Sequence, residues 1–445
     1  MSSIENAIEH GAWTPRQKAV VFLAALSIVF DGFDNQALGL AIASMAKSWN
    51  VPAAAFGTAA AIGLIGMTLG TWLAGLLGDR IGRRRSLIGS VLLFGIATTL
   101  CSAADGVMQL TVLRFIAGIG LGGAMPNATA IAAEFSPLRH RPIAVTMTIV
   151  CVPLGGLVGA LAASLLLPLF GWPSLFLVGG LAPLALTLAL YAWLPESPAF
   201  LSRFPERRSE LDAVMKRMGH DTVFTVPPPS TVKEPISRPR LSTLFGSEYL
   251  ISTTGLWLAF FLCLIAVYTT FNWVPATLSS AGFSSEVASL ALAGFNLGGI
   301  VGALMGGWAI SRLGSRLVLS VLSAIGAAVA GIMTGIGASH LSPTLLLALI
   351  AIMGFSVNGT QTTLFALASH VYTSDVRATG VGAALGFGRF GAILSSFIGA
   401  AIAAAGMTSG IFAVLCVAMV GTLVGVRLVR RHIGPSDKPS NPAHG

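Results

Sequence analysis

Long apolar stretches, separated by short charged or Gly/Pro-containing segments, constrain this sequence more than any other feature. A helix needs about 20 mostly apolar residues to cross the roughly 30 Å hydrocarbon core of a bilayer. The 445-residue chain is 54% hydrophobic and only 10% charged, whereas an ordinary soluble domain has roughly 25% charged residues. The pattern therefore predicts an all-α membrane protein with twelve transmembrane helices, near residues 18–46, 54–77, 86–104, 107–133, 143–167, 173–194, 250–278, 285–309, 317–338, 342–368, 380–404 and 408–428.

The basic residues predict which ends of these spans face the cytoplasm. Lys and Arg are retained preferentially on that side of the membrane. With the N-terminus inside, the cytoplasmic segments hold all of the 26 Lys and Arg residues except Lys47, Arg114 and Arg389. Both termini are therefore expected to be cytoplasmic, and the polar start of the chain, which is unlike a signal peptide, is expected to be retained. The net charge of +9 then reflects loop topology, and no nucleic-acid partner is expected.

A charged segment at residues 195–249, with prolines at 227, 228 and 229, divides the spans into two sets of six. We expect N-terminal and C-terminal six-helix bundles at 1–194 and 250–430, joined by this cytoplasmic linker and followed by a cytoplasmic tail at 431–445. An internal repeat supports the division: GLLGDRIGRR at 75–84 returns as GWAISRLGSR at 307–316, 232 residues later. Many secondary transporters are built from two such halves.

The repeated motif is the most specific local signal. Gly75, Gly78 and Gly82 are expected to permit a tight turn between two helices, and Asp79 can cap or pair at a helix terminus. The neighbouring charges could exchange ion pairs with Glu134, Arg139 and Arg141 across the loops, which would form a gate. The alternative is that these charges only set the topology. The gating set is completed by Arg80, Arg83, Arg84, Arg312 and Arg377.

Ionisable residues inside apolar spans are the next informative feature, because each costs about 2.5 to 3.5 kcal/mol at mid-bilayer on insertion scales. Asp31 and Asp34 lie three residues apart near the middle of the first span and share one helix face. Arg114 in the fourth span reaches a similar depth. We predict a switchable pair of Asp34 with Arg114 that carries a proton. The alternatives are a structural polar pair of the two acids and a permanent ion pair.

Arg389 lies near the middle of the eleventh span, whereas the acids of its own half lie at span ends or in a loop: Glu248, Glu286 and Asp375. Its planar guanidinium matches a carboxylate in two-point contact, so it predicts an anionic substrate. The competing interpretation is a pair with Asp31 or Asp34. Further polar and aromatic side chains could line the substrate site, although helix packing is an alternative for each of them: Tyr268, Asn272, Trp273, Asn358 and Gln361.

Small residues recur at helix-packing spacing, as at Gly66 and Gly70, and again at Gly298, Gly302 and Gly306. Such positions let helix backbones approach closely within a membrane. Ordinary packing is the favoured interpretation, and a surface that slides during transport is the alternative.

The twelve-span plan and the repeated glycine-rich motif resemble the major facilitator superfamily. Within it, four segments are similar to the aromatic acid/H⁺ symporter family: DGFD at 31–34, GIGLGGAMPNATAIAAEFSP at 118–137, PESPAFL at 195–201 and RATGVGAALGFGRFGAI at 377–393. The resemblance implies the major facilitator fold and import of a small aromatic carboxylate with protons across a bacterial inner membrane. It also implies that Asp31 and Asp34 matter for transport and Asp79 for conformational cycling. A more distant resemblance to sugar/H⁺ symporters is also present.

Physics favours proton coupling for such a substrate. A monoanion that enters against about 100 mV, inside negative, faces about 2.3 kcal/mol, which one accompanying proton cancels. We therefore expect a proton symporter for a carboxylate of the 4-hydroxybenzoate, protocatechuate or benzoate type, working as a monomer by alternating access. Symport of another organic acid or a sugar, and export of aromatic compounds, are the alternatives. The four cysteines are scattered singly, so no metal site is expected. The sequence contains no nucleotide loop or nucleophile elbow, so we expect no other cofactor and no enzymatic reaction.

Overall fold

The computed structural model describes residues 8–9, 11–219 and 241–435, and within them the regular structure is helical. Twelve of the described helices are long and apolar enough to cross a membrane. This confirms the number of spans predicted from the sequence. The chain divides into two compact units, Met1–Ser237 and Arg238–Gly445. The prolines at 227–229 and most of the predicted cytoplasmic tail lie outside the described residues.

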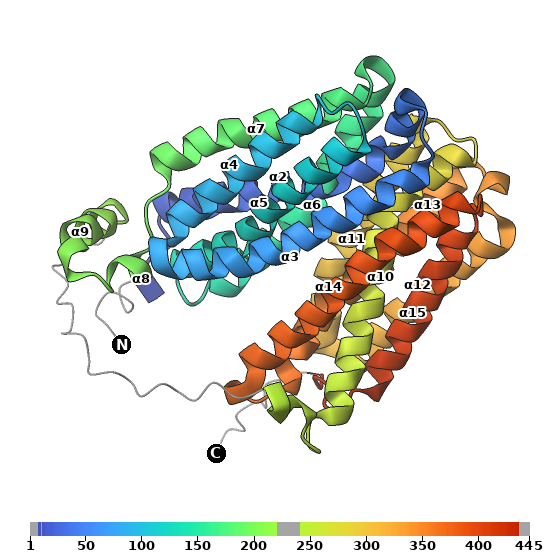
Figure 1. Cartoon of the computed structure of the whole chain (residues 1–445). Helices are drawn as coiled ribbons and strands as arrows, with labels where there is room; N and C mark the ends of the chain where they lie inside the picture. The colour runs from blue at the N-terminus through green and yellow to red at the C-terminus, as the bar shows by residue number, and fades with distance from the viewer. Residues whose placement is uncertain (1–7, 10, 220–240, 436–445) are drawn as a thin grey trace. The chain divides into compact units, whose positions relative to one another are not determined.

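Each unit contains six long helices (Figure 1). The helices of the N-terminal unit are α2 (Pro15–Trp49), α3 (Phe56–Ile81), α4 (Arg83–Cys101), α5 (Val107–Glu134), α6 (Arg141–Phe170) and α7 (Trp172–Trp193). Those of the C-terminal unit are α10 (Leu250–Ser280), α11 (Ser285–Leu313), α12 (Ser315–Ile336), α13 (Pro343–Val371), α14 (Ser374–Ala404) and α15 (Gly410–Leu428).

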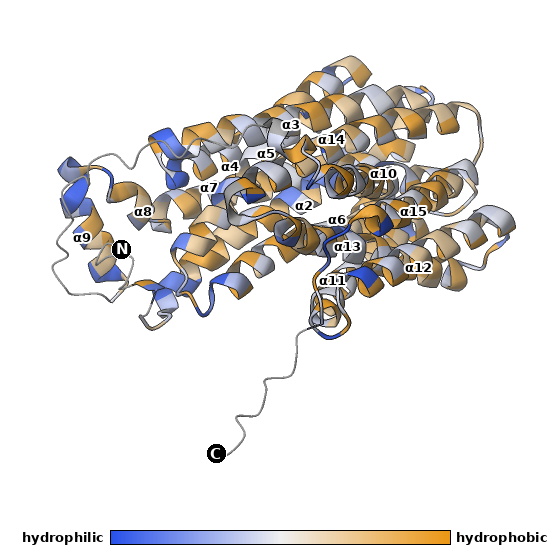
Figure 2. Ribbon diagram, turned by 90° about the horizontal axis from the view of Figure 1, so that it is seen from below, coloured by the Kyte–Doolittle hydropathy of each residue, from blue (hydrophilic) through white to orange (hydrophobic). Residues whose placement is uncertain are grey.

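Part of the segment predicted to be a linker is folded and belongs to the N-terminal unit. It forms the short helix α8 (Pro198–Leu201), one turn of 3₁₀ helix, and α9 (Arg208–Arg217). Leu211, Val214 and Met215 form the buried face of α9. Figure 2 shows several hydrophilic residues on α9, in contrast to the mostly hydrophobic long helices. The long helices also expose large apolar side chains, such as Leu169 and Leu188, both 74% exposed, as expected of surfaces that face lipid.

Glycines bring α3 and α5 of the N-terminal unit into close contact. A Cβ atom at Gly66 or Gly70 would lie 2.3 or 2.1 Å from a carbonyl oxygen of α5. In the C-terminal unit a Cβ at Gly298 or Gly302 would lie 2.0 Å from a carbonyl oxygen of α13. Gly298 and Gly302 follow Gly66 and Gly70 by 232 residues, the same interval as in the sequence repeat. These glycines therefore lie at close contacts between helices in both units, as the packing interpretation predicts.

The repeated motif forms the turns between α3 and α4 and between α11 and α12. Gly82 has φ +103° and Gly314 has φ +79°, a conformation that glycine adopts without steric cost. In the second turn, the backbone N–H of Ser315 donates to the carbonyl of Ile433 at 2.9 Å, and the N–H of Ile433 donates to the Ser315 hydroxyl at 2.9 Å. Residues 429–435, here called the C-terminal strap, therefore hold this turn from the end of α15.

Candidate functional site

The best-defined polar site in the membrane-spanning part of the N-terminal unit is an ion pair between α2 and α5. Arg114 donates from Nη1 to Oδ1 of Asp34 at 3.1 Å and from Nη2 to Oδ2 at 3.0 Å. Nη2 also donates to the Asp34 carbonyl at 3.1 Å. Asp34 is 0% and Arg114 5% exposed. The structure thus brings together the two residues that the sequence predicted to pair, in the two-point geometry typical of strong guanidinium–carboxylate contacts.

A third residue, which sequence reasoning missed, completes this site. The Thr98 hydroxyl on α4 donates to Oδ1 of Asp34 at 2.7 Å, and Thr98 is fully buried. Cys101 lies one turn further along α4, beside the Arg114 guanidinium. Threonine in a span is a weak signal, because its hydroxyl usually bonds the carbonyl four residues earlier, as Thr99 does with Gly95. Only the helix packing distinguishes Thr98 from its neighbour.

Asp31 is also buried, at 1% exposed, one turn before Asp34 on α2. Between the two acids, a Cβ at Gly32 would lie 2.0 Å from the carbonyl oxygen of Val152 on α6. The acidic turn of α2 is therefore packed directly against a neighbouring backbone. This position desolvates both carboxylates, which is the condition under which an acid responds strongly to nearby charge.

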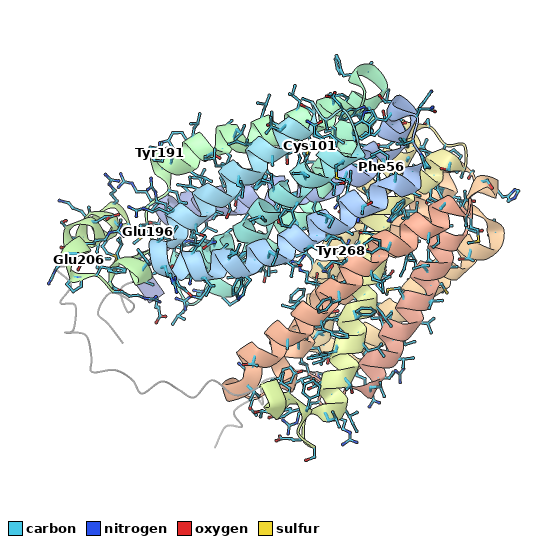
Figure 3. All side chains as sticks on the ribbon, in the orientation of Figure 1. Phe56, Cys101, Tyr191, Glu196, Glu206 and Tyr268 are labelled. Carbon is cyan, nitrogen blue, oxygen red and sulfur yellow. The ribbon has the colours of Figure 1, made fainter. Side chains whose placement is uncertain are left out.

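Arg389 on α14 is half-buried and donates from Nη1 to the hydroxyl of Tyr268 on α10 at 3.2 Å. The sequence placed both residues at the substrate site but did not predict this contact. A phenol that accepts from a guanidinium keeps its own O–H to donate. The pair can therefore offer N–H and O–H donors to one oxyanion, with the positive charge held on α14. Figure 3 labels Tyr268 on α10.

The other predicted substrate residues are packed between helices. Trp273 is fully buried, and a Cβ at Gly399 of α14 would lie 2.2 Å from its ring. Asn358 is 7% exposed, and a Cβ at Gly299 of α11 would lie 2.3 Å from its amide nitrogen. Glycines on the facing helices make room for these two side chains. Asn272 is buried and Gln361 half-buried.

The motif turn of the N-terminal unit is held by a residue that the sequence did not single out. Glu196, just after α7, accepts from the backbone N–H of Arg84 at 3.0 Å. The Arg84 side chain donates to the carbonyls of Leu194 and Tyr191, each at 2.6 Å. Figure 3 labels Tyr191 and Glu196 at this end of α7. Gly82 has no room for a Cβ, which would lie 2.2 Å from the Glu196 carboxylate.

Arg83 connects the predicted latch residues. It bonds Asp79 one turn earlier at 2.6 Å and approaches Glu134 at the end of α5 at 3.9 Å. Glu134 in turn accepts from the hydroxyl of Ser197. Asp79 is 57% exposed, so this set lies at a solvent-accessible end of the bundle. The structure thus joins the motif to α5 and to the segment after α7, as an ion-pair latch requires.

Several predicted members of the gating set lie elsewhere. Arg141 pairs with Glu9 at 3.2 Å and donates to the Ala133 carbonyl, and both of these partners lie outside the motif. Its expected ion-pair exchange with the motif stays a prediction. A Cβ at Gly75 would meet nothing within 4 Å, so the turn does not require glycine there. Arg312 lies over the Trp308 ring at 5.2 Å. Arg80 and Arg377 are exposed.

Comparisons with known proteins identify the family and the fold. A sequence model of the Major Facilitator Superfamily matches residues 24–330 and 256–444. The chain is 36% identical over 408 residues to the gallate transporter of Pseudomonas putida, which covers 91% of this chain and 89% of that protein. It is also 36% identical over 394 residues to the 4-hydroxybenzoate transporter PcaK of Pseudomonas aeruginosa, covering 87% of each. The crystal structure of a D-xylose-proton symporter aligns with a TM-score of 0.71, at 18% identity over 94% of this chain and 98% of that one.

Proposed function

This chain belongs to the major facilitator superfamily, and from that premise we propose that it is a proton-coupled symporter that imports a small aromatic carboxylate. The family and the two long relatives make it a multi-pass membrane transporter rather than an enzyme. The proposal adds the substrate class, the coupling ion and the direction. It also places the protein in a bacterial inner membrane, as a monomer with both termini in the cytoplasm.

The Arg389–Tyr268 pair is the observation that carries the substrate class. A guanidinium and a phenolic hydroxyl that share one hydrogen bond, at 3.2 Å, suit a carboxylate that accepts from both. Phe271 lies edge-on to Tyr268, with ring centroids 5.8 Å apart, so an apolar surface adjoins the anion site. The relatives named for gallate and 4-hydroxybenzoate support an aromatic ring beside that carboxylate.

The Asp34 site supports proton coupling. A buried carboxylate that depends on one guanidinium and one hydroxyl for its charge takes up a proton when either partner moves away. Arg114 reaches Asp34 from α5 and Thr98 reaches it from α4, so a shift of either helix changes the balance. We propose that protonation of Asp34 accompanies each substrate inward, which removes the electrical penalty on the anion.

Uptake into proteoliposomes tests the proposal. With an imposed pH gradient, acid outside, we expect accumulation of labelled 4-hydroxybenzoate, gallate or benzoate and none of glucose. R389Q should lower the efficiency of uptake by about 10- to 100-fold, because hydrogen bonds to a charged group contribute about 1.5 to 3 kcal/mol. R427Q, which removes an exposed arginine of α15, is the matched control and should transport normally.

The proton step needs a separate measurement, because D34N leaves Arg114 buried without its carboxylate and can destabilise the protein. Substrate exchange between equal pools on both sides needs no net proton movement. D34N and the double variant D34N/R114Q should retain exchange and lose gradient-driven accumulation. Accumulation by D34N at the unmodified level would contradict the coupling role, and accumulation of glucose alone would contradict the substrate class.

A further inference from the structure

A cavity of about 690 Å³ lies within the N-terminal unit, away from Asp34 and Arg114. Its walls come from the start of α2, the end of α7 with the residues that follow it, and the linker helix α9. Arg16 joins α2 to α9, because its Nη1 donates to the backbone carbonyl of Arg217, the last residue of α9, at 2.9 Å. The proposed transport mechanism does not use this cavity.

Three arginines line the cavity: Arg16, Arg84 and Arg217. Within the described part of the chain, none of the three forms an ion pair. Arg16 and Arg84 donate to backbone carbonyls instead. These acceptors are neutral, so they orient the guanidinium groups without cancelling their charge.

The two acids that also line the cavity have other partners. Glu196 accepts from the backbone N–H groups of Arg84 and Ser197, both at 3.0 Å. Glu210 accepts from two nitrogens of Arg207, at 2.9 and 2.7 Å. Backbone N–H groups leave the charge of Glu196 in place, whereas Arg207 compensates that of Glu210. The three arginines outnumber the one uncompensated acid, so the cavity keeps a net positive charge that an anion can balance. Arginine is well suited to a phosphate, whose oxygens match its planar fork of donors.

The rest of the wall is apolar, and it includes Val20 and Leu23 of α2 and Val214 and Met218 from the linker. The position along the spans is also informative. The candidate span of α2 begins at Pro15 and that of α7 ends at Trp193, so the cavity lies at one end of both candidate spans. Trp193 lines it and is 71% exposed, and the nearby Tyr191 is 69% exposed. Exposed Trp and Tyr side chains are typical of the headgroup level of a bilayer.

We propose that this cavity binds the phosphate headgroup of an anionic phospholipid, with the acyl chains against the apolar wall and α9 clamped to α2 across the lipid. A phosphate explains the three arginines, and the attached hydrocarbon explains the apolar wall at the end of two spans. A free phosphate shares only the first feature.

Lipid titration of the purified full-length protein in detergent, followed by native mass spectrometry, tests the site. The probes are phosphatidylglycerol, phosphatidylcholine and inorganic phosphate. The variant R16Q/R217Q should bind phosphatidylglycerol about 25-fold more weakly, since each arginine near an anionic lipid contributes about fivefold. The control K18Q/K216Q removes the same charge from two exposed lysines that do not line the cavity, and it should bind within about twofold of the unmodified protein.

A second variant tests the cavity without changing any charge, so that the result does not depend on R16Q/R217Q alone. A213W keeps every charge and places a bulky ring in the cavity, which Ala213 of α9 lines, so it should also weaken phosphatidylglycerol binding. Equal losses in R16Q/R217Q and K18Q/K216Q would overturn the proposal, because they would indicate diffuse attraction. Equal binding of phosphatidylcholine, or displacement of the lipid by inorganic phosphate at millimolar concentration, would overturn the assignment to an anionic lipid.

Discussion

Asp34 depends on partners from two other helices, separated from it by 64 residues for Thr98 and 80 for Arg114. Arg114 supplies a charge, whereas Thr98 supplies a neutral donor at 2.7 Å. Removing the neutral donor tests the site without leaving a buried charge alone. A substitution at Thr98 is therefore expected to disturb the fold less than a substitution at Asp34 or Arg114.

We predict that T98V lowers gradient-driven accumulation of substrate by about tenfold. The Thr98 hydroxyl bonds the Asp34 carboxylate, and a hydrogen bond to a charged group contributes about 1.5 kcal/mol or more. Accumulation in proteoliposomes with an imposed pH gradient measures the effect. The control is T99V, because the Thr99 hydroxyl bonds the carbonyl of Gly95 on its own helix. Unchanged accumulation by T98V would show that Thr98 does not influence the coupling step.

Single residues also show the limit of sequence reasoning. The acids and arginines inside spans were identified because their charge is costly in a membrane. Thr98 and Glu196 were not, although Thr98 bonds Asp34 and Glu196 bonds the motif turn. Placing a threonine in a span or a glutamate in a polar segment costs little free energy, so the local sequence does not distinguish these two residues from others of their type.

At the scale of helices, close packing in each unit rests on glycines that face a neighbouring backbone. A Cβ at Gly122 of α5 would lie 2.0 Å from the carbonyl oxygen of Met67 on α3. Because lipid supplies no hydrophobic drive between helices, such backbone contact is a main source of cohesion. The helix axes must separate if a side chain is inserted there.

We predict that G122A lowers the thermal stability of the purified protein by an amount equivalent to about 1 to 3 kcal/mol, as overpacking does. Thermal unfolding in detergent measures the effect. G75A is the matched control, since a Cβ at Gly75 meets nothing within 4 Å and alanine is a better helix former than glycine, so it should not lower the unfolding temperature. Equal unfolding temperatures for both variants would mean that the α3–α5 contact relaxes without cost.

The C-terminal strap is a second element whose contacts have a measurable consequence. Burial lowers the pKa of His432, and the charges of Arg316 and His370 lower it further, while backbone carbonyls at the end of α15 oppose the shift. Its Nδ1 lies 3.1 Å from the Ser315 hydroxyl. A proton on His432 is therefore less favourable in the folded chain than in the unfolded chain.

We predict that acid destabilises this contact. The unfolded histidine, with a pKa of 6.5, takes up its proton first as the pH falls, so the contribution to stability is complete above about pH 6.5 and is lost below it. Unfolding temperatures between pH 8 and pH 5 should fall less steeply in H432N than in the unmodified protein. H340N, in the loop before α13, is the control. The same slope in H432N and the unmodified protein would rule out this histidine.

At the scale of the whole molecule, the duplication is visible in the packing as well as in the sequence. The α3–α5 and α11–α13 glycine contacts are separated by the same interval as the motif turns. The two turns are nevertheless held differently. Glu196 bonds the first, whereas the backbone of Ile433 bonds the second, and Ser311 stands where the first copy has Asp79.

We predict that D79N shifts the balance between inward-open and outward-open states by about 1.5- to 5-fold and leaves the topology unchanged. The exposed Asp79–Arg83 pair, at 2.6 Å, belongs to a class of contacts that contributes about 0.2 to 1 kcal/mol. Alkylation of cysteines introduced at each end of the spans measures accessibility, and reporters fused to both termini check the topology. The control is D105N in an exposed loop. No shift in D79N would leave the turn with a purely structural role.

The sequence by itself determined the twelve spans, the duplicated halves and the residues whose charge had to be explained, because hydropathy and the cost of burying charge are local properties. Only the tertiary structure decided which of these side chains meet. In the structure Arg114 pairs with Asp34, and Arg389 donates to Tyr268. Trp273 packs between helices, and Arg141 pairs with Glu9. Contacts between helices distant in sequence depend on their rotation and depth, which no local pattern encodes.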